Sequence, residues 1–322
     1  MHAVLRWLAK RRIMGYFYEG EAVILALHRV CHTPSLLGPS FCISPTELVR
    51  ILNNLRHEGF LFISLDRLIQ ALHAQIPLRR AVVITIDDGY EDFINEAYLI
   101  FQRFGVPFTL YLVSGFVRGE LFPWWVGLEI LIRERESFTL EGERYISYTI
   151  TQKKRLFLRL WRLYKKYPPR KACDLIEVAF RREGLATERL YELSLNEDAV
   201  KRLAQDPLCT VGAHTSSHFW LPLLDRQTLI AELEENKTYL ERLVHKEVLD
   251  FAYPYGGKQD IPKGIENLLK EIGYRSAVSL MWSPVYGTHR NFLFYLPRRV
   301  VSPSLSAHDL CRSHFTRIFP FL

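Results

Sequence analysis

Two adjacent carboxylates and two histidines are the side chains of this sequence whose types and spacing could do chemistry. Asp87 and Asp88 directly follow an apolar run that ends at Ile86, and His214 and His218 lie four residues apart much later in the chain. One carboxylate and two imidazoles can hold a divalent ion, and the second carboxylate can then take a proton from a water molecule on that ion. The four residues together predict a metal-assisted hydrolase.

Each pair taken alone also fits a structural role. An Asp-Asp-Gly sequence, as at 87–89, often forms the turn after a strand, because Asp and Gly suit turns. Single histidines are frequently buried or cap a helix. The histidine pair is flanked by Thr215, Ser216 and Ser217, and its spacing allows both rings to reach one ligand. We therefore favour a shared metal site over two unrelated structural features.

Strands that alternate with helices must position these residues. Six apolar segments are typical of strands, and they lie at 22–27, 81–86, 108–113, 209–213, 248–252 and 275–279. Helical patterns lie between them, and the clearest begins at Ser44 with Pro45 and Glu47 in its first turn and ends at Gly59. Such alternation implies a parallel sheet, open or closed into a barrel. The polar motifs follow strand ends, where α/β barrels form their active sites.

The alternation breaks between residues 118 and 198, where the pattern is charged, aromatic and irregular. A hairpin is expected there with its turn at 141–144, followed by a basic amphipathic helix over 153–167. The expected apolar side of this helix is formed by Leu156, Leu160, Leu163 and Tyr167. We interpret 118–198 as an insertion within a single domain that spans 1–322.

The composition is that of a mildly basic globular protein. The chain has 322 residues, 48% of them hydrophobic and 24% charged, and 42 basic residues exceed 35 acidic ones to give a net charge of +7. That surplus only weakly favours an anionic partner. The five cysteines are Cys31, Cys42, Cys173, Cys209 and Cys311. Since they are far apart and form no Cys-x-x-Cys motif, reduced thiols in the cytoplasm are expected, and no signal peptide or membrane-spanning stretch is recognisable.

Three segments of the chain resemble the motifs of polysaccharide deacetylases with the NodB homology domain, carbohydrate esterase family 4. The motif-like segments lie at 85–90, 214–218 and 251–256. The resemblance extends over 22–31, 81–116 and 205–301, and the insertion has no part in it. It implies an α/β fold, a distorted (β/α)7-type barrel with an inserted subdomain.

The resemblance also implies a role for each residue. Asp88, His214 and His218 would hold the metal, usually Zn²⁺, with Co²⁺, Ni²⁺ or other ions accepted by some members. Asp87 would be the general base for water that attacks the acetamide of an N-acetylated sugar. The backbone N–H of Tyr255 would stabilise the oxyanion, as fixed N–H dipoles do.

The chain departs from the family pattern in two places. Ala252 stands where an Arg normally precedes the Pro-Tyr pair by two positions, and no late strand ends in the His that acts as general acid. Residues 25–30 resemble that late motif, an order found in a circularly permuted branch that includes poly-N-acetylglucosamine deacetylases of biofilms. His28 is therefore the candidate that protonates the leaving amine, and a buried strand-end histidine is the alternative. Arg298 could replace the missing Arg and orient Asp87, or be a plain surface arginine.

We expect a metal-dependent hydrolase that removes the N-acetyl group from an amino sugar of a polysaccharide, an oligosaccharide or a lipid-linked glycan precursor, as in bacterial exopolysaccharide or lipopolysaccharide biosynthesis. A deformylase or other amidase with the same metal site, and a glycan-binding protein without activity, stay open as alternatives. Aromatic side chains that could stack on sugar rings or simply pack are Tyr90, Trp124, Trp125 and Trp220.

The expected partners are the glycan and, at the inner membrane face, anionic lipid. The basic helix over 153–167 and the N-terminal segment, with Trp7 beside Arg6, Lys10 and Arg11, could contact such a surface peripherally or form a solvated charged face. No nucleic-acid-binding module is recognisable, so nucleic acid is not an expected partner.

Overall fold

The computed structural model describes residues 22–38, 40–168, 170–306 and 310. The N-terminal segment expected to touch lipid and Cys311 lie outside these residues.

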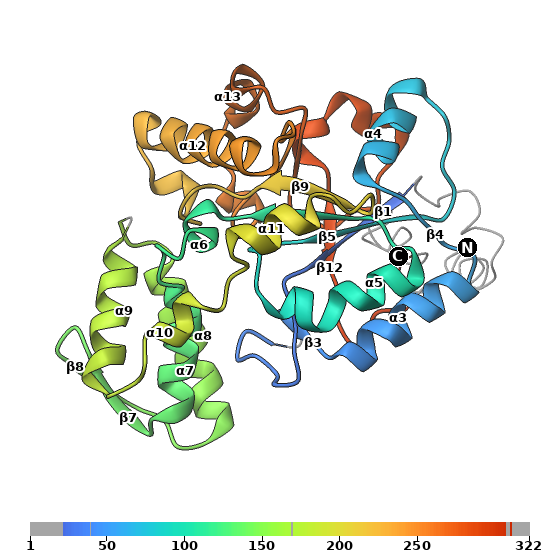
Figure 1. The fold of residues 1–322 in the computed structure, drawn as a ribbon. Helices are drawn as coiled ribbons and strands as arrows, with labels where there is room; N and C mark the ends of the chain where they lie inside the picture. The colour runs from blue at the N-terminus through green and yellow to red at the C-terminus, as the bar shows by residue number, and fades with distance from the viewer. Residues whose placement is uncertain (1–21, 39, 169, 307–309, 311–322) are drawn as a thin grey trace, which may run out of the picture.

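A mostly parallel sheet forms a nearly closed barrel of seven strands surrounded by helices, which confirms the predicted α/β barrel (Figure 1). In spatial order the strands are β11 (Ser276–Val278), β10 (Asp250–Ala252), β9 (Cys209–Ala213), β6 (Phe108–Leu112), β5 (Ala81–Ile86), β1 (Ala22–Leu27) and β12 (Arg298–Val300). A parallel bridge between Val278 and Leu296 brings the segment before β12 back to β11. The short strand β4 (Leu61–Phe62) pairs with β5 outside this order.

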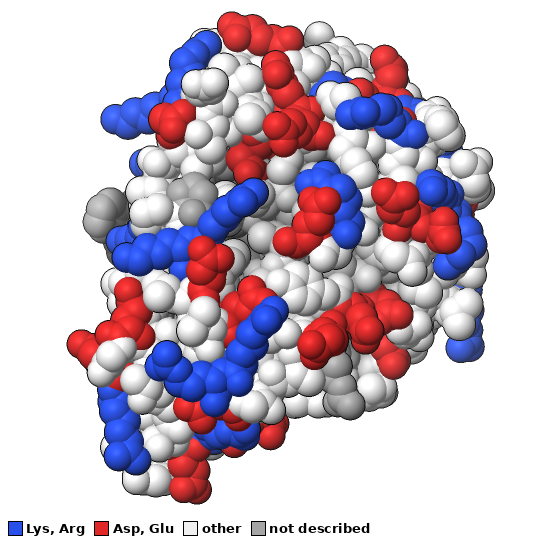
Figure 2. All heavy atoms as spheres, turned by 60° about the vertical axis from the view of Figure 1, so that its left-hand side comes forward, with Lys and Arg blue, Asp and Glu red and all other residues white. Residues whose placement is uncertain are grey.

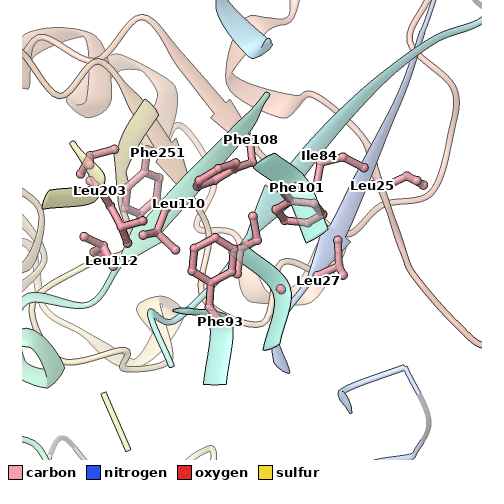
Figure 3. Packing of buried hydrophobic residues seen from close by; sticks show 14 of the residues in the cluster. Leu25, Leu27, Ile84, Phe93, Phe101, Phe108, Leu110, Leu112, Leu203 and Phe251 are labelled. Atoms are coloured by element: carbon pink, nitrogen blue, oxygen red, sulfur yellow. The ribbon is translucent and has the colours of Figure 1, made fainter. Parts of the chain in front are cut away.

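The strands β1 and β5 bury every one of their residues, as the continuous apolar runs predict. Their parallel register places Ile24 beside Val83 on one side and Arg298 of β12 on the other. Figure 3 shows part of the packing between the barrel and its helices, with Phe93 and Phe101 against Phe108. The barrel is therefore a packed core, and its ends are where polar residues can gather.

Helices cover the outside of the barrel. They are α3 (Pro45–His57), α4 (Leu65–Ala74), η1 (Phe93–Tyr98), α5 (Leu99–Phe104), α6 (Ser114–Val117), α11 (Glu197–Leu203), α12 (Arg226–Val244) and α13 (Ile265–Ile272). The predicted capping box of Ser44 and Glu47 begins α3, and Asp225 caps the first turn of α12. The elements α4, β4 and β12 were not among those expected. In the described part of the chain, no helix combines the length and the apolar character needed to cross a bilayer.

The remaining elements are short. They are β2 (Arg29–Val30), β3 (Cys42–Ile43), η2 (Leu221–Leu223), η3 (Lys258–Asp260), η4 (Gly287–Asn291) and η5 (Leu293–Tyr295).

The region expected to be an insertion forms a separate lobe beside the barrel (Figure 1). Its elements are α7 (Trp124–Glu134), β7 (Ser137–Leu140), β8 (Glu143–Ile146), α8 (Ile150–Tyr164), α9 (Lys171–Arg182) and α10 (Glu188–Tyr191). They pack around a second hydrophobic cluster, which also includes Leu36, Tyr90, Val113 and Phe116 from outside the expected insertion, whereas Leu195 and α11 belong to the barrel core. The hairpin is confirmed, and the boundaries at 118 and 198 stay predictions.

The buried face of α8 differs from the expected one. The structure buries Phe157, Leu160 and Tyr164, while Leu163 is 46% exposed. The helix begins and ends three residues earlier than predicted, and its buried positions follow the spacing i, i+3, i+7 from Phe157. Leucines lie on several sides of this helix, so its sequence is compatible with two apolar faces. Packing against α7 determines which of the two faces is buried.

Cys31 and Cys42 form a disulfide, with their Cα atoms 5.8 Å apart. The prediction of reduced thiols was therefore wrong for this pair. The two cysteines are eleven residues apart and carry no spacing signal, but parallel pairing of β2 with β3 sets Arg29 opposite Cys42 and so brings Cys31 close. Among the described cysteines, Cys173 and Cys209 are free.

Candidate active site

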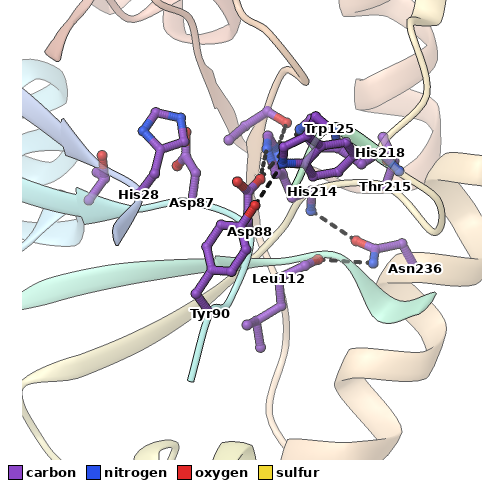
Figure 4. Close-up of polar contacts among 12 residues, drawn as sticks. His28, Asp87, Asp88, Tyr90, Leu112, Trp125, His214, Thr215, His218 and Asn236 are labelled. Carbon is purple, nitrogen blue, oxygen red and sulfur yellow. Dashed lines mark hydrogen bonds and ion pairs between the residues drawn. The ribbon is translucent and has the colours of Figure 1, made fainter. Parts of the chain in front are cut away.

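Asp88, His214 and His218 meet at one end of the barrel (Figure 4). Nε2 of each histidine lies 3.4 Å from Oδ1 of Asp88, all three side chains are buried, and one ligand atom from each lies within 4.8 Å of the others. Asp88 follows β5 and the histidines follow β9. Because β5, β6 and β9 run parallel as neighbours, residues after their carboxyl ends reach the same rim.

This donor set fits a divalent cation. Oδ1 of Asp88 is buried and has no hydrogen-bond partner among the described residues, and a buried carboxylate oxygen in that position calls for a positive partner. Nδ1 of His214 lies 2.7 Å from the carbonyl oxygen of Ala252, a contact that orients the ring and leaves Nε2 toward the site. One carboxylate and two imidazoles are ligands that zinc accepts, with further positions left for water or substrate.

The electrostatics of the site agree with this role. Burial raises the pKa of Asp88, but the neighbouring His218 and His214 outweigh burial and bring the pKa below its usual range. Burial lowers the pKa of His218 to about 3. The His218 imidazole is therefore neutral at neutral pH, which is the form that binds metals.

Four non-glycine residues around the site have left-handed backbone conformations. The φ angles are 74° at Asp88, 67° at Thr215, 54° at His218 and 63° at Tyr255. Such conformations cost free energy and persist only where the surrounding structure enforces them, which is typical of functional sites.

Helix α12 holds the histidine segment in place. The N–H of His214 is shared between Oδ1 of Asn236 and the carbonyl oxygen of Leu112, each 3.0 Å away, and Nδ2 of Asn236 donates to the same carbonyl (Figure 4). Oε2 of Glu232 accepts a hydrogen bond from the N–H of Ser217 at 2.8 Å. Neither Asn236 nor Glu232 was predicted from the sequence. The available signal was a polar pair spaced i, i+4 on the otherwise apolar face of a helix.

Asp87 is bound by Arg298 in a bidentate ion pair. Nη1 lies 2.6 Å from Oδ1 and Nη2 lies 2.7 Å from Oδ2, and Nη1 also donates to Oγ1 of Thr85. Arg298 is 1% exposed, so it is not a surface arginine. Burial raises the pKa of Asp87, but the charge of Arg298 and the nearby His214 outweigh burial and lower the pKa below its ordinary value. Asp87 is therefore an ionised carboxylate with a fixed orientation.

His28 follows β1 and lies next to Asp87 (Figure 4). Its Nε2 atom is 3.9 Å from Oδ2 of Asp87, and its ring packs against Phe41 with 5.3 Å between the ring centroids. Nδ1 is buried and has no hydrogen-bond partner among the described residues. The side chain is only 16% exposed, so His28 is a largely buried histidine that also reaches the proposed base.

Tyr255 lies next to His218. Its ring centroid is 5.0 Å from that of His218. Within the described chain, the N–H of Tyr255 donates to no backbone carbonyl oxygen, as expected for a donor kept for a ligand.

The aromatic residues proposed as sugar platforms divide into two groups. Tyr90, Trp124 and Trp125 are buried, and Nε1 of Trp125 donates to the Tyr90 hydroxyl oxygen at 2.8 Å. These three pack inside the protein and cannot present a face to a sugar. Trp220 is half-buried and follows His218 by two residues.

A family model described as polysaccharide deacetylase matches residues 75–277, well over half of the chain. The matched segment contains Asp87, Asp88, His214, His218 and Tyr255, whereas His28 and Arg298 lie outside it. The structure brings these two residues to the others through β1 and β12.

Several solved structures share the fold. A deacetylase PplD from Streptococcus pyogenes, in complex with acetate, has a TM-score of 0.60 at 16% identity, over 91% of this chain and 97% of that chain. IcaB from Ammonifex degensii has a TM-score of 0.57 at 18% identity, over 91% of this chain and 97% of that chain. A de-N-acetylase from Aggregatibacter actinomycetemcomitans has a TM-score of 0.54 at 15% identity, over 94% of this chain and 99% of that chain. No curated protein sequence matches the chain.

Proposed function

Because this chain belongs to the polysaccharide deacetylase family, we propose that it is a metal-dependent hydrolase that removes the N-acetyl group from an amino sugar of a glycan. The observation that carries the proposal is the buried set of Asp88, His214 and His218 beside Asp87, whose two oxygens are held by Arg298.

The proposed reaction is hydrolysis of the acetamide. Asp88, His214 and His218 would hold the ion, which when bound supplies Lewis-acid polarisation of the amide carbonyl and a lower pKa for water. Asp87 accepts the proton of the water whose oxygen bonds to the acetamide carbon, and Arg298 keeps this base ionised and in place.

The remaining residues handle the oxyanion and the leaving group. The N–H of Tyr255 donates to the amide oxygen as negative charge develops there. The C–N bond then breaks, His28 gives a proton to the sugar amine, and acetate and the free amine leave. His28 Nε2 lies 3.9 Å from Oδ2 of Asp87, so both groups can reach one bound amide.

Acetate release from N-acetylated oligosaccharides by the zinc-loaded protein tests this function. The parent should contain one ion per chain and release acetate, and His214→Ala should lose both the ion and turnover, because it removes a ligand. His73→Ala, an exposed histidine on α4, is the control and should change neither.

Other outcomes would identify the alternatives. A parent that holds one ion but cleaves only N-formylated sugars is a deformylase. A parent that binds glycan without an ion and without turnover is a non-catalytic binding protein.

Two observations favour different cellular compartments for the enzyme. The sequence predicts a cytoplasmic enzyme that acts on a lipid-linked precursor at the inner membrane face. The Cys31–Cys42 disulfide favours an oxidising compartment, where such bonds persist, and an exported glycan as substrate. Fractionation of the native host with thiol trapping decides between the two compartments. Only an exported enzyme should be found in the periplasm or medium with Cys31 and Cys42 oxidised.

Peripheral contact with anionic lipid stays a prediction. The residues of α8 that would make it are exposed, and they are Lys154, Arg155, Arg159 and Arg162. On the face shown in Figure 2, basic and acidic side chains are interspersed and form no continuous basic surface. Sedimentation with vesicles that contain phosphatidylglycerol tests the contact, and an unchanged supernatant fraction would contradict it.

A further inference from the structure

Lys165 directly follows α8 and is buried, with 8% of its surface exposed. Its Nζ atom donates to Oδ1 of Asp260, 2.5 Å away, and Asp260 is itself 4% exposed. Transfer of an ammonium group from water into a protein interior is costly unless the group is paired. The pair joins the inserted lobe to η3, the short helix that follows the Tyr255 segment.

Three aromatic rings surround the ammonium group. Nζ of Lys165 lies 4.4 Å from the ring centroid of Tyr255, 5.4 Å from that of Trp161 and 5.8 Å from that of Trp220. Nε1 of Trp220 donates to the same oxygen of Asp260 at 2.9 Å. The rings come from the inserted lobe, the histidine segment and the Tyr255 segment, so one cation contacts all three.

The same contacts restrain the backbone around Tyr255. Oδ2 of Asp260 accepts a hydrogen bond from the N–H of Gly257 at 3.1 Å. On the other side, the N–H of Leu280 donates to the carbonyl oxygen of Gly256 at 2.7 Å. Gly256 has a φ of 64°, and a Cβ atom there would lie 2.8 Å from the Leu280 nitrogen. The 255–257 turn, whose backbone is left-handed at Tyr255 and Gly256, is therefore held between Leu280 and Asp260.

We propose that Lys165 is a positioning residue: together with Asp260 it fixes the 255–257 turn, so that the N–H of Tyr255 stays directed at the amide being hydrolysed. This inference rests on the proposed deacetylase function. A buried ion pair contributes little net stability compared with apolar packing, so a geometric role explains the pair better than a stabilising one. The inserted lobe would then form part of the active site rather than an accessory to it.

Lys165→Met in the full-length protein tests the proposal by two measurements. Hydrogen exchange of peptides covering 253–260, in the metal-free protein, should become about tenfold faster because local opening of the turn becomes easier. With zinc and an N-acetylated oligosaccharide, kcat should fall about 10–100-fold, which is a smaller fall than deletion of an oxyanion donor causes. KM should change less than about threefold. Lys201→Met, at an exposed lysine of α11, is the control and should match the parent in both.

A second variant covers the case in which Lys165→Met fails to fold, because that change leaves the Asp260 charge buried and unpaired. Lys165→Met combined with Asp260→Asn removes both charges and keeps one amide oxygen, which can accept a hydrogen bond from Trp220 or from Gly257 but not from both. It should fold, and its kcat should remain about tenfold or more below that of the parent.

Parental exchange rates in 253–260 would overturn the inference, as would parental kcat in the double variant. A raised KM with unchanged kcat would also overturn it, because Lys165 would then contact substrate instead of positioning the turn. A parent without deacetylase activity would refute the proposed function, while the exchange measurement would still decide whether Lys165 restrains the turn.

Discussion

The neighbours of Asp87 determine its charge and its orientation. Arg298 binds both carboxylate oxygens, His28 approaches one of them, and Asp88 next to it faces the histidine pair. Two adjacent aspartates thus have different environments, one with an arginine and one with two imidazoles. We infer a division of labour in which the first handles protons and the second holds the ion.

Asp87→Asn should remove most turnover while the ion stays bound. The amide can keep a hydrogen bond to Arg298, but it cannot accept a proton from water at neutral pH. We expect kcat to fall by about 10²–10⁴-fold, the usual contribution of general base catalysis. Acetate release and metal content per chain measure the two effects, and Asp198→Asn, at a carboxylate whose side chain is 80% exposed, is the control. Parental turnover in Asp87→Asn would exclude Asp87 as the base.

His28→Ala should slow release of the sugar amine, because no other group is proposed to protonate it. The expected fall in kcat is about 10²–10⁴-fold. His28→Gln, which retains polarity and approximate size without a titratable ring, should be similarly slow if proton transfer matters and near parental if His28 only packs against Phe41. Steady-state kinetics of both variants separate these roles.

The sequence predicted the site residues unevenly, for a physical reason. Asp87, Asp88 and the histidine pair lie in short contiguous motifs that follow strands, so their meeting could be expected from a parallel sheet. Lys165 and Asn236 lie in no such motif. Their hydrogen-bond partners are 95 and 22 residues away in the chain, and only packing brings the partners together. A buried lysine looks the same in sequence as the exposed lysines beside it.

At the scale of elements, α12 acts as the support of the histidine segment, and Asn236 is its central contact. Asn236→Leu removes hydrogen bonds to the N–H of His214 and to the carbonyl oxygen of Leu112. The expected loss of unfolding free energy is about 1–3 kcal/mol, the cost of weakening buried hydrogen bonds.

Metal affinity should fall in the same variant by about 10–100-fold, as for groups that orient a ligand. Chemical denaturation of the metal-free protein and zinc titration provide the measurements. Glu235→Leu, at the neighbouring exposed position, should behave like the parent. If Asn236→Leu bound zinc as tightly as the parent, α12 would not be needed to hold the histidines.

The loop between β2 and β3 is a second supporting element. It carries Phe41 against His28, and Oγ of Ser35 donates to Glu129 in the inserted lobe. Its ends are joined by the Cys31–Cys42 disulfide.

Reduction of that disulfide should lower the unfolding free energy by about 2–3 kcal/mol, the expected effect of opening a loop of this length. Turnover should also fall, because Phe41 no longer fixes the His28 ring. Denaturation and kinetics with and without a reductant measure both effects. The variant with Cys31→Ser and Cys42→Ser should resemble the reduced parent and show no response to reductant. Identical stability of oxidised and reduced parent would contradict the disulfide.

At the scale of the whole molecule, the sheet pairs strands from opposite ends of the described chain. β1 pairs with β12, and this pairing brings His28 and Arg298 to a site whose other residues lie between 87 and 255. The strand β12 was not predicted because it is three residues long and contains two arginines. Strand–helix alternation predicted a parallel sheet, open or closed, and the family resemblance predicted the barrel, but neither predicted the strand β12.

A fragment of residues 75–277, the segment matched by the family model, should therefore fail to fold as a stable unit. It lacks β1, whose large apolar residues are all buried in the barrel; they are Val23, Ile24, Leu25 and Leu27. At about 1.5–3 kcal/mol for each buried side chain, their loss amounts to about 6–12 kcal/mol, comparable with the total stability of about 5–15 kcal/mol for a typical domain. The fragment should also lack the arginine that orients Asp87. Thermal unfolding followed by circular dichroism, with the complete chain as reference, measures the effect. A fragment that melts cooperatively near the parental temperature would show that β1 and β12 are dispensable for folding, and that their residues only complete the chemistry.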